Sequence, residues 1–428
     1  MTYKLTKNIW LSIGAISILT MVTPSFLLAD WTINSDFSPA GVRPTLIVKD
    51  MVTFNDKVYI AGHDFSGRFR RTEGGYETGV IAKWNPQTRD WETIGTATFQ
   101  NDHGKSFDAS VEGLAVVNNP VTKVDELVVV GSFSHISFQE KNLPASYVAR
   151  WDGTTWVQFE TKELPYRFYD LNLIESFDGT FVVANRQQIF KWDWQNSSWE
   201  QFLYVNEDNG SILDLAVSKK DTGSDRLIVG GFFSHINKAD VETEGVAYFE
   251  NGTWHGVGDV SKDWRKRKNV YVYSVLGRKD EIYVGGLFNQ MGGKDAKNIA
   301  HWDGNQWNAV GKGADNSVSN LTIVDGAPDR NSYLVVGSNF SNTPKGGLIQ
   351  KSWLATWNLD KEEWEKFSPI IQGWKVKNSL DSLWPTEVNS ILPYENGFLV
   401  GGKFTGFWEP GDNFNFTGSP NLIRFDYQ

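Results

Sequence analysis

The chain has 428 residues, a formal net charge of −10, 19 tryptophans and no cysteine. The acidic balance argues against a nucleic-acid-binding protein, and the lack of cysteine excludes disulfides, thiolate metal ligands and a cysteine nucleophile. Stability must therefore come from a packed core or from repetition.

Residues 1–29 are predicted to form a signal peptide. Lys4 and Lys7 give it a positive start, a largely apolar stretch follows, and Ala29 precedes a polar residue. An uncleaved anchor is the alternative, but the apolar run is a poor fit to a membrane-spanning helix of about 20 residues. We therefore expect a secreted or periplasmic chain, residues 30–428, without a transmembrane segment after cleavage.

One sequence motif recurs along the rest of the chain. It consists of a strand that ends in Gly, often followed by Phe, then a variable stretch, and then Ala-x-Trp-Asp-Gly-x-x-Trp or a variant of it. The two aromatics of each copy are five or seven residues apart. A difference of two preserves the face that each side chain occupies on a strand, and Asp-Gly and Asn-Gly form tight turns. Each copy is therefore predicted to end in a hairpin. The aromatic pairs are Trp84 and Trp91, Trp151 and Trp156, Trp192 and Trp199, Phe249 and Trp254, Trp302 and Trp307, and Trp357 and Trp364.

A short apolar strand precedes each Gly-ended strand, which makes four strands per unit. Seven units are predicted, and the last has its third strand around Phe425 but no fourth strand. Residues 30–33, Asp-Trp-Thr-Ile, resemble the missing strand. The sequence therefore predicts an all-β fold, a seven-bladed β-propeller of four-stranded blades in which the N-terminal strand completes the last blade. Residues 30–428 would form this single domain.

These repeats resemble two groups of known proteins. The repeats have a second strand that ends in Gly, an aromatic residue in the third strand and Trp in the fourth, and in this they resemble kelch-like β-propellers. The motif Val-Gly-Gly-x-Phe is similar to the repeats of Rax2-like secreted propellers. The resemblance covers residues 30–428 and implies the fold, but kelch-type rings include binding scaffolds, sialic-acid epimerases and copper oxidases. Copper oxidases of the galactose oxidase type depend on a Tyr–Cys crosslink, which this chain cannot form.

Long connections are predicted to share one face of the ring, because links between second and third strands and links between units emerge at the same end. Long loops on a rigid scaffold are common binding sites, and two of them are basic. An anionic ligand would suit these loops; the alternative is ordinary solvated loop charge. The candidate ligand-binding residues are Arg68, Arg70, Arg71, Trp264, Arg265, Lys266, Arg267, Lys268, Trp374, Trp384 and Trp408.

The third unit differs from the others because residues 185–189 leave almost no connection between its second and third strands. The loop-rich face is therefore expected to be low there and to form a notch.

Small or polar residues recur near the start of each first strand, where they would line the central channel. A structural explanation is that crowding around the channel excludes bulky side chains and that water satisfies the polar groups. The functional alternative is an ion site that uses Asp50 and Asp214. The channel-lining candidates are Asp50, Asn172, Asp214, Ser274, Asn320 and Ser390, with Gly113 in the same frame. His135 and His235 occupy matching Phe-Ser-His-Ile motifs. Repetition explains this match, and a zinc pair without an evident third ligand is the alternative.

The favoured function is a noncatalytic binding or scaffold propeller that recognises a glycan, a surface polymer or a protein partner through its loop-rich face. A carbohydrate-active enzyme, a lyase or hydrolase with carboxylates on that face, is the alternative, and an adhesion module is a third hypothesis. An enzyme would need a compact acid–base pair with perturbed pKa values. No cofactor, metal or nucleic acid is implied, and an acidic glycan or surface polymer is the expected partner.

Overall fold

The computed structural model of the protein describes residues 31–34, 46–64, 76–101, 103–159, 165, 168–205, 210–220, 224–236, 241–258, 270–325, 329–340, 352–365, 370–372, 387–395, 397–404, 406–408 and 421–427. Within these ranges every regular element is a β-strand, and there is no helix. The predicted signal peptide lies outside the described residues.

Seven sheets of four or more strands follow one another along the chain, and we number them by their first strands. Sheet 1 contains β2 (Leu46–Phe54), β3 (Lys57–Asp64), β4 (Thr78–Asn85) and β5 (Asp90–Gln100), and continues into β6 (Ser106–Phe107), β9 (His135–Phe138) and β10 (Lys141–Pro144). Sheet 2 contains β7 (Ser110–Asn119), β8 (Val124–Ser132), β11 (Val148–Trp151) and β12 (Trp156–Gln158). Sheet 3 contains β13 (Leu173–Phe177), β14 (Thr180–Ala184), β15 (Gln188–Asp193) and β16 (Ser198–Tyr204).

The remaining four sheets repeat the four-stranded pattern. Sheet 4 contains β17 (Ser211–Ser218), β18 (Arg226–Phe232), β21 (Val246–Glu250) and β22 (Thr253–Gly256). Sheet 5 contains β23 (Tyr271–Arg278), β24 (Glu281–Leu287), β27 (Ile299–Trp302) and β28 (Trp307–Ala309). Sheet 6 contains β29 (Val318–Val324), β30 (Tyr333–Phe340), β31 (Ser352–Asn358) and β32 (Glu363–Glu365), and sheet 7 contains β34 (Glu387–Tyr394), β35 (Gly397–Lys403), β37 (Leu422–Tyr427) and β1 (Trp31–Asn34).

Three two-stranded sheets complete the described structure. They pair β19 (His235–Ile236) with β20 (Val241–Glu242), β25 (Gln290–Met291) with β26 (Lys294–Asp295), and β33 (Ile370–Gln372) with β36 (Gly406–Trp408).

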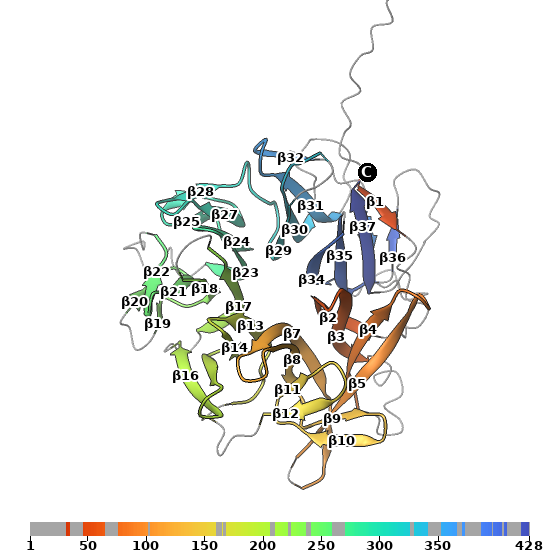
Figure 1. The fold of residues 1–428 in the computed structure, drawn as a ribbon. Coiled ribbons are helices and arrows are strands. Elements are labelled where there is room, and N and C mark those ends of the chain that lie inside the picture. Colours follow the sequence, from red (N-terminus) through yellow and green to blue (C-terminus); the bar gives the residue numbers. More distant parts are fainter. Residues whose placement is uncertain are drawn as a thin grey trace, which may run out of the picture.

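The first strands of the seven larger sheets lie around a common centre, as Figure 1 shows. From β2 through β7, β13, β17, β23 and β29, each first strand contacts the next, and β34 contacts both β29 and β2. The sheets therefore stand around one axis in a β-propeller arrangement, with six four-stranded blades and the longer sheet 1 between sheets 7 and 2.

The N-terminal strand closes the last sheet. β1 pairs antiparallel with β37, with Trp31 opposite Tyr427 and Asn34 opposite Arg424. This confirms that the segment after the predicted signal peptide supplies the fourth strand of the last unit. The outer edge of β37 is thereby covered, which removes an open edge from the array.

Sheet 1 is longer than the predicted four strands. β5 runs on to Gln100, and β9, from the connection that follows β8 in sheet 2, pairs with it through Thr96 opposite Ser137 and Thr98 opposite His135. The continuation has a physical reason, because β9 satisfies backbone groups that the long outer strand would otherwise leave unpaired.

The predicted aromatic pairs face one another across the hairpins of six sheets. Each pair is directly opposite in register, and the ring centroids lie between 5.0 Å (Trp192–Trp199) and 5.6 Å (Trp302–Trp307) apart. Most of these rings are buried in the layers between sheets, and Trp156 Nε1 donates to the Ile94 carbonyl of sheet 1 (2.6 Å). The paired aromatic residues that stand out in the sequence thus mainly fill the core between the sheets.

Six sheets share a register shift near the start of the first strand. In β2 the shift falls between Val48 and Asp50, and in β17 between Ile212 and Asp214; sheets 2, 5, 6 and 7 repeat it. The backbones approach so closely here that a Cβ on Gly62 would lie 1.9 Å from the Ile47 carbonyl oxygen. Sheet 3 has no shift in its β13–β14 ladder, and its second strand ends in Ala184 and is followed by Asn185, without the Gly of the other units. The third unit therefore departs from the others in backbone as well as in sequence.

Candidate functional site

Most of the predicted binding loops lie outside the described residues. This applies to Arg68, Arg70, Arg71, Trp264, Arg265, Lys266, Arg267, Lys268, Trp374 and Trp384. Trp408 ends β36, whose backbone pairs it with Ile370 of β33. The ligand-binding role of these loops is therefore still a prediction.

Two of the predicted channel residues join neighbouring sheets. The Asp50 carboxylate accepts hydrogen bonds from the backbone N–H of the next residue (2.8 Å) and from that of Leu114 in β7 (2.8 Å). Asp214 repeats this arrangement with the residue after it (2.9 Å) and with Val275 in β23 (2.8 Å). Burial raises the pKa of Asp50 to about 6 and that of Asp214 to about 7, although the backbone hydrogen bonds act in the opposite direction.

Three further residues of the predicted channel lining continue these links around the axis. Ser274 Oγ accepts from a backbone N–H of β29 (3.1 Å), Asn320 Nδ2 donates to a backbone carbonyl of β34 (3.0 Å), and Ser390 Oγ donates to Asp50 (3.2 Å). We call Asp50, Asp214, Ser274, Asn320 and Ser390 the channel belt. Its polar groups hold sheets together, so these contacts give the belt a structural role.

Glu175 in β13 is a further acid near the axis. By register it occupies the position of Ala115 in β7 and Ala216 in β17, where an apolar side chain packs. Burial, followed by repulsion from Asp214 and Asp50, raises its pKa to about 8, and Lys219 acts in the opposite direction. No described residue donates a hydrogen bond to its carboxylate, so Glu175 differs from the channel belt.

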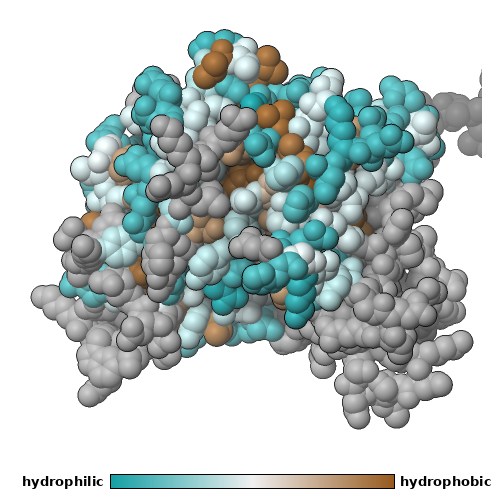
Figure 2. All heavy atoms as spheres, turned by 90° about the horizontal axis from the view of Figure 1, so that it is seen from below, coloured by the Kyte–Doolittle hydropathy of each residue, from teal (hydrophilic) through white to brown (hydrophobic). Residues whose placement is uncertain are grey.

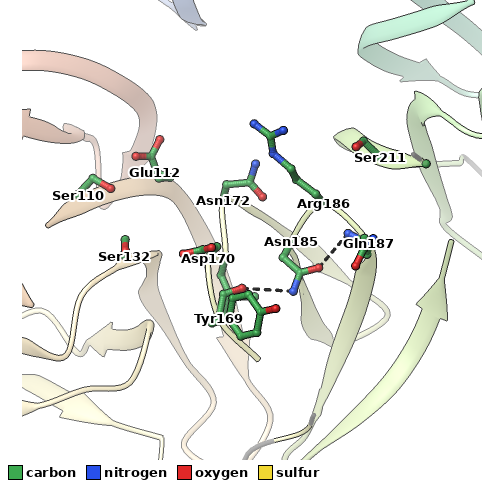
Figure 3. A pocket seen from close by; sticks show the side chains of 12 residues that line it. Ser110, Glu112, Ser132, Tyr169, Asp170, Asn172, Asn185, Arg186, Gln187 and Ser211 are labelled. Atoms are coloured by element: carbon green, nitrogen blue, oxygen red, sulfur yellow. Dashed lines mark hydrogen bonds between the residues drawn. The ribbon is translucent and has the colours of Figure 1, made fainter. Parts of the chain in front are cut away.

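A polar concavity of about 680 Å³ lies over sheet 3, at the end where its second strand turns into the third. Three stretches of sheets 2, 3 and 4 meet there, and Figure 3 shows their side chains around it. The position matches the notch expected from the short third-unit connection. The lining residues are Ser110, Glu112, Ser132, Tyr169, Asp170, Leu171, Asn172, Asn185, Arg186, Gln187, Gly210 and Ser211.

The turn between β14 and β15 forms one wall of this concavity. The Asn185 side-chain oxygen accepts from the N–H groups of Gln187 and Gln188 (both 2.9 Å). Its Nδ2 donates to the Tyr169 carbonyl (3.2 Å), and Figure 3 draws this bond and the one from Gln187. The Arg186 carbonyl accepts from Ile212 N–H in β17 (2.6 Å). The turn is thus fixed both to the preceding connection and to the next sheet.

The opposite wall comes from sheet 2. Ser110 and Glu112 belong to β7, and Ser132 ends β8. Glu112 is the extra residue at the register shift of sheet 2, and it forms an ion pair with Lys49 of sheet 1 (3.5 Å). One of the two carboxylates in the concavity is therefore already paired with a cation.

The floor between the walls precedes β13. Tyr169 is 48% exposed, an unusual state for a large aromatic side chain in this structure. Asp170 follows it in a left-handed backbone conformation (φ 51°), and Asn172 donates its backbone N–H to the Ala184 carbonyl (3.0 Å). Asn172 therefore lines the concavity, and register places Leu173 where Asp214 lies in sheet 4.

The concavity combines hydroxyls, amides, two carboxylates, one guanidinium and an exposed aromatic ring. Sequence reasoning located the notch but missed Tyr169, Asp170 and Arg186 as its residues. The usable signal was the short 185–189 connection, because residues beside a missing loop become exposed.

The two matched histidines do not come together. His135 lies in β9, which pairs within sheet 1, and His235 lies in β19 beside β20; each Nδ1 is within hydrogen-bond distance of the preceding serine (2.9 and 2.8 Å). Across the described residues, no group of three His, Asp or Glu side chains is placed to hold a metal ion.

The described residues on the face seen from below in Figure 2 are mostly hydrophilic, with hydrophobic residues in small groups. None of the described elements is a helix long and apolar enough to cross a membrane.

No protein-family model and no curated protein matches this chain. Among solved structures, it is similar to the extracellular domain of a proposed one-component system, BT4673, from B. thetaiotaomicron, with 12% identity and a TM-score of 0.48 over 94% of this chain and 40% of that one. A second structure of the extracellular domain of BT4673, described as a hybrid two-component system, gives 12% identity and 0.48 over 93% and 39%. The computationally designed Ika8 protein gives 10% and 0.45 over 91% and 98%. The chain thus spans about 40% of the BT4673 chain, and likenesses this distant carry no information on function.

Proposed function

We propose that this protein is a secreted or periplasmic, noncatalytic β-propeller that binds a glycan in the concavity over sheet 3. In this proposal residues 1–29 are a signal peptide and residues 30–428 form a single ring of seven blades, with β2 to β5 of sheet 1 as the seventh. The concavity of about 680 Å³, lined mainly by polar residues and by the exposed Tyr169, is the observation that carries the proposal.

The chemistry of the lining suits a sugar. Serine hydroxyls and side-chain amides donate to and accept from sugar hydroxyls, and carboxylates accept from them. An exposed aromatic ring offers a face to the C–H side of a pyranose. The volume falls within the roughly 300–1,000 Å³ of typical ligand sites. The wall formed by the β14–β15 turn is fixed by backbone hydrogen bonds, which lowers the entropy cost of binding.

The positions of the perturbed acids favour binding over lyase or hydrolase chemistry. The described carboxyl groups with raised pKa values are Asp50, Asp214 and Glu175, and none of them lines the concavity. Asp50 and Asp214 also have their oxygens engaged by backbone N–H groups. These contacts do not form an acid–base pair that is placed for catalysis in the concavity.

Replacing Tyr169 with alanine tests the proposal. Thermal unfolding of the purified protein is followed across a panel of neutral and acidic oligosaccharides, because a ligand at 100 times its Kd stabilises by about 2.7 kcal/mol. We expect at least one sugar to raise Tm, and Y169A to weaken that sugar about tenfold, or about 1.4 kcal/mol.

Tyr76→Ala is the matched control, since Tyr76 is 47% exposed but belongs to the connection before β4 and does not line the concavity. A sugar that stabilises the wild type and Y169A equally would place binding elsewhere. A panel without any stabilising sugar would contradict glycan binding and favour a protein partner.

A further inference from the structure

Arg186 is the cation among the described residues that line the concavity, and none of the described residues provides it with a counter-ion. Its side chain is exposed, and no carboxylate of the described residues lies within ion-pair distance of its guanidinium. Figure 3 shows the guanidinium reaching away from the β14–β15 turn, on the side of Asn172. In a chain of net charge −10, an unpaired arginine inside a pocket calls for an explanation.

The backbone under Arg186 is fixed more firmly than that of an ordinary loop arginine. Its carbonyl accepts from Ile212 N–H of β17 (2.6 Å), and the Gln187 carbonyl accepts from Val205 N–H (2.9 Å). Asn185 closes the turn from inside. The guanidinium therefore starts from a fixed point between sheets 3 and 4, which reduces the entropy lost when it binds an anion.

The two carboxylates of the concavity, Glu112 and Asp170, leave the positive charge of Arg186 available to a ligand. Glu112 is paired with Lys49 at 3.5 Å. Asp170 has an exposed side chain, with no hydrogen bond or ion pair to the other described residues. An anion bound at Arg186 thus does not have to displace a partner, and Asp170 remains free to accept hydrogen bonds from ligand hydroxyls.

Resting on the proposed glycan binding, we propose that the ligand is an acidic glycan built of uronic acids, with a sugar carboxylate bound by Arg186 and sugar hydroxyls bound by Asp170. A guanidinium presents parallel N–H donors that match the two oxygens of a carboxylate. One cation beside two carboxylates suits a ligand with one negative charge per sugar, whereas a densely sulfated or phosphorylated chain would require more cations. Tyr169 lies in the same concavity and offers its ring to the same sugar.

Isothermal titration calorimetry of the purified protein tests this inference. The probes are short oligomers of galacturonate, glucuronate and mannuronate, each beside its methyl ester, which keeps the ring and removes the charge. We expect at least one acidic oligomer to bind at least tenfold more tightly than its ester, with an affinity that falls as salt is added. Arg186→Gln should remove that preference, and Arg186→Lys should retain part of it because the charge remains without the planar fork.

Arg330→Gln is the matched control, since Arg330 is exposed in the turn between β29 and β30, at the opposite end of the strands. It should bind like the wild type, and R186Q should keep the wild-type Tm because its side chain is exposed. Esters that bind as tightly as the acids, or an R186Q variant that keeps the preference, would overturn this inference and leave glycan binding standing. If none of the uronates binds while a neutral sugar does, only the inference fails; if no sugar of either kind binds, both proposals fail.

Discussion

Replacing Asp214 with alanine is expected to lower the free energy of unfolding by about 3 kcal/mol. The Asp214 carboxylate accepts from two backbone N–H groups, one in β17 (2.9 Å) and one in β23 (2.8 Å). Alanine would leave both donors without an acceptor at the junction of sheets 4 and 5, and each unpaired buried donor costs about 1–3 kcal/mol. Urea denaturation followed by tryptophan fluorescence measures the change.

Ser274→Ala provides a graded comparison in the same belt. Ser274 Oγ accepts from one backbone N–H, that of Leu321 (3.1 Å), so its loss is expected to cost about 1 kcal/mol. D214A should therefore be clearly more destabilising than S274A. Equal and small effects, below about 0.5 kcal/mol for both, would show that the channel belt does not hold the sheets together.

Replacing Glu175 with glutamine is expected to stabilise the protein at alkaline pH. Burial and the nearby Asp214 and Asp50 raise the pKa of Glu175 from 4.5 to about 8. A carboxyl whose pKa is raised on folding contributes its full stability below pH 4.5 and loses it as the pH rises toward 8. Glutamine is neutral throughout, so it avoids the ionisation that the folded state disfavours.

The difference in unfolding free energy between E175Q and the wild type should be near zero at pH 4.5, grow with pH, and level off above pH 8. We expect a plateau of about 2 kcal/mol, roughly half of what 1.4 kcal/mol per pKa unit would give, because the side chain is partly exposed. Thermal melts at half-unit pH intervals measure the difference. A constant offset across this range would contradict the raised pKa, and destabilisation at pH 9 would indicate a bound cation instead.

The repeat frame could be predicted because each copy carries its own local signal. Trp151 and Trp156 mark a hairpin, and the strand at Trp31–Asn34 was recognisable because it repeats the missing fourth strand of the last unit. Such features depend on alternation and turn chemistry within a few residues. The continuation of β5 into β9 was missed, since it depends on an edge that only the assembled sheets create.

The concavity was predictable in place but not in composition. The short connection after Asn185 predicted that the loop-rich face is low at the third unit. The site, however, joins residues of three sheets, such as Glu112, Tyr169 and Ser211. No repeat motif includes them, because they lie where the third unit departs from the pattern. Glu175 was missed although it replaces an apolar residue of the repeat, and aligning that position across the units would have shown it.

Hydrogen–deuterium exchange of the purified protein, with and without a bound oligosaccharide, shows where on the ring the sugar binds. If the sugar binds over sheet 3, we expect slower exchange in peptides covering residues 168–172, 185–188 and 210–212, with no change in the hairpin turns at 152–155 and 303–306 at the opposite end of the strands. Protection confined to the connections at 64–79, 259–269 or 368–387 would contradict it, because binding would then take place on the long loops and not over sheet 3.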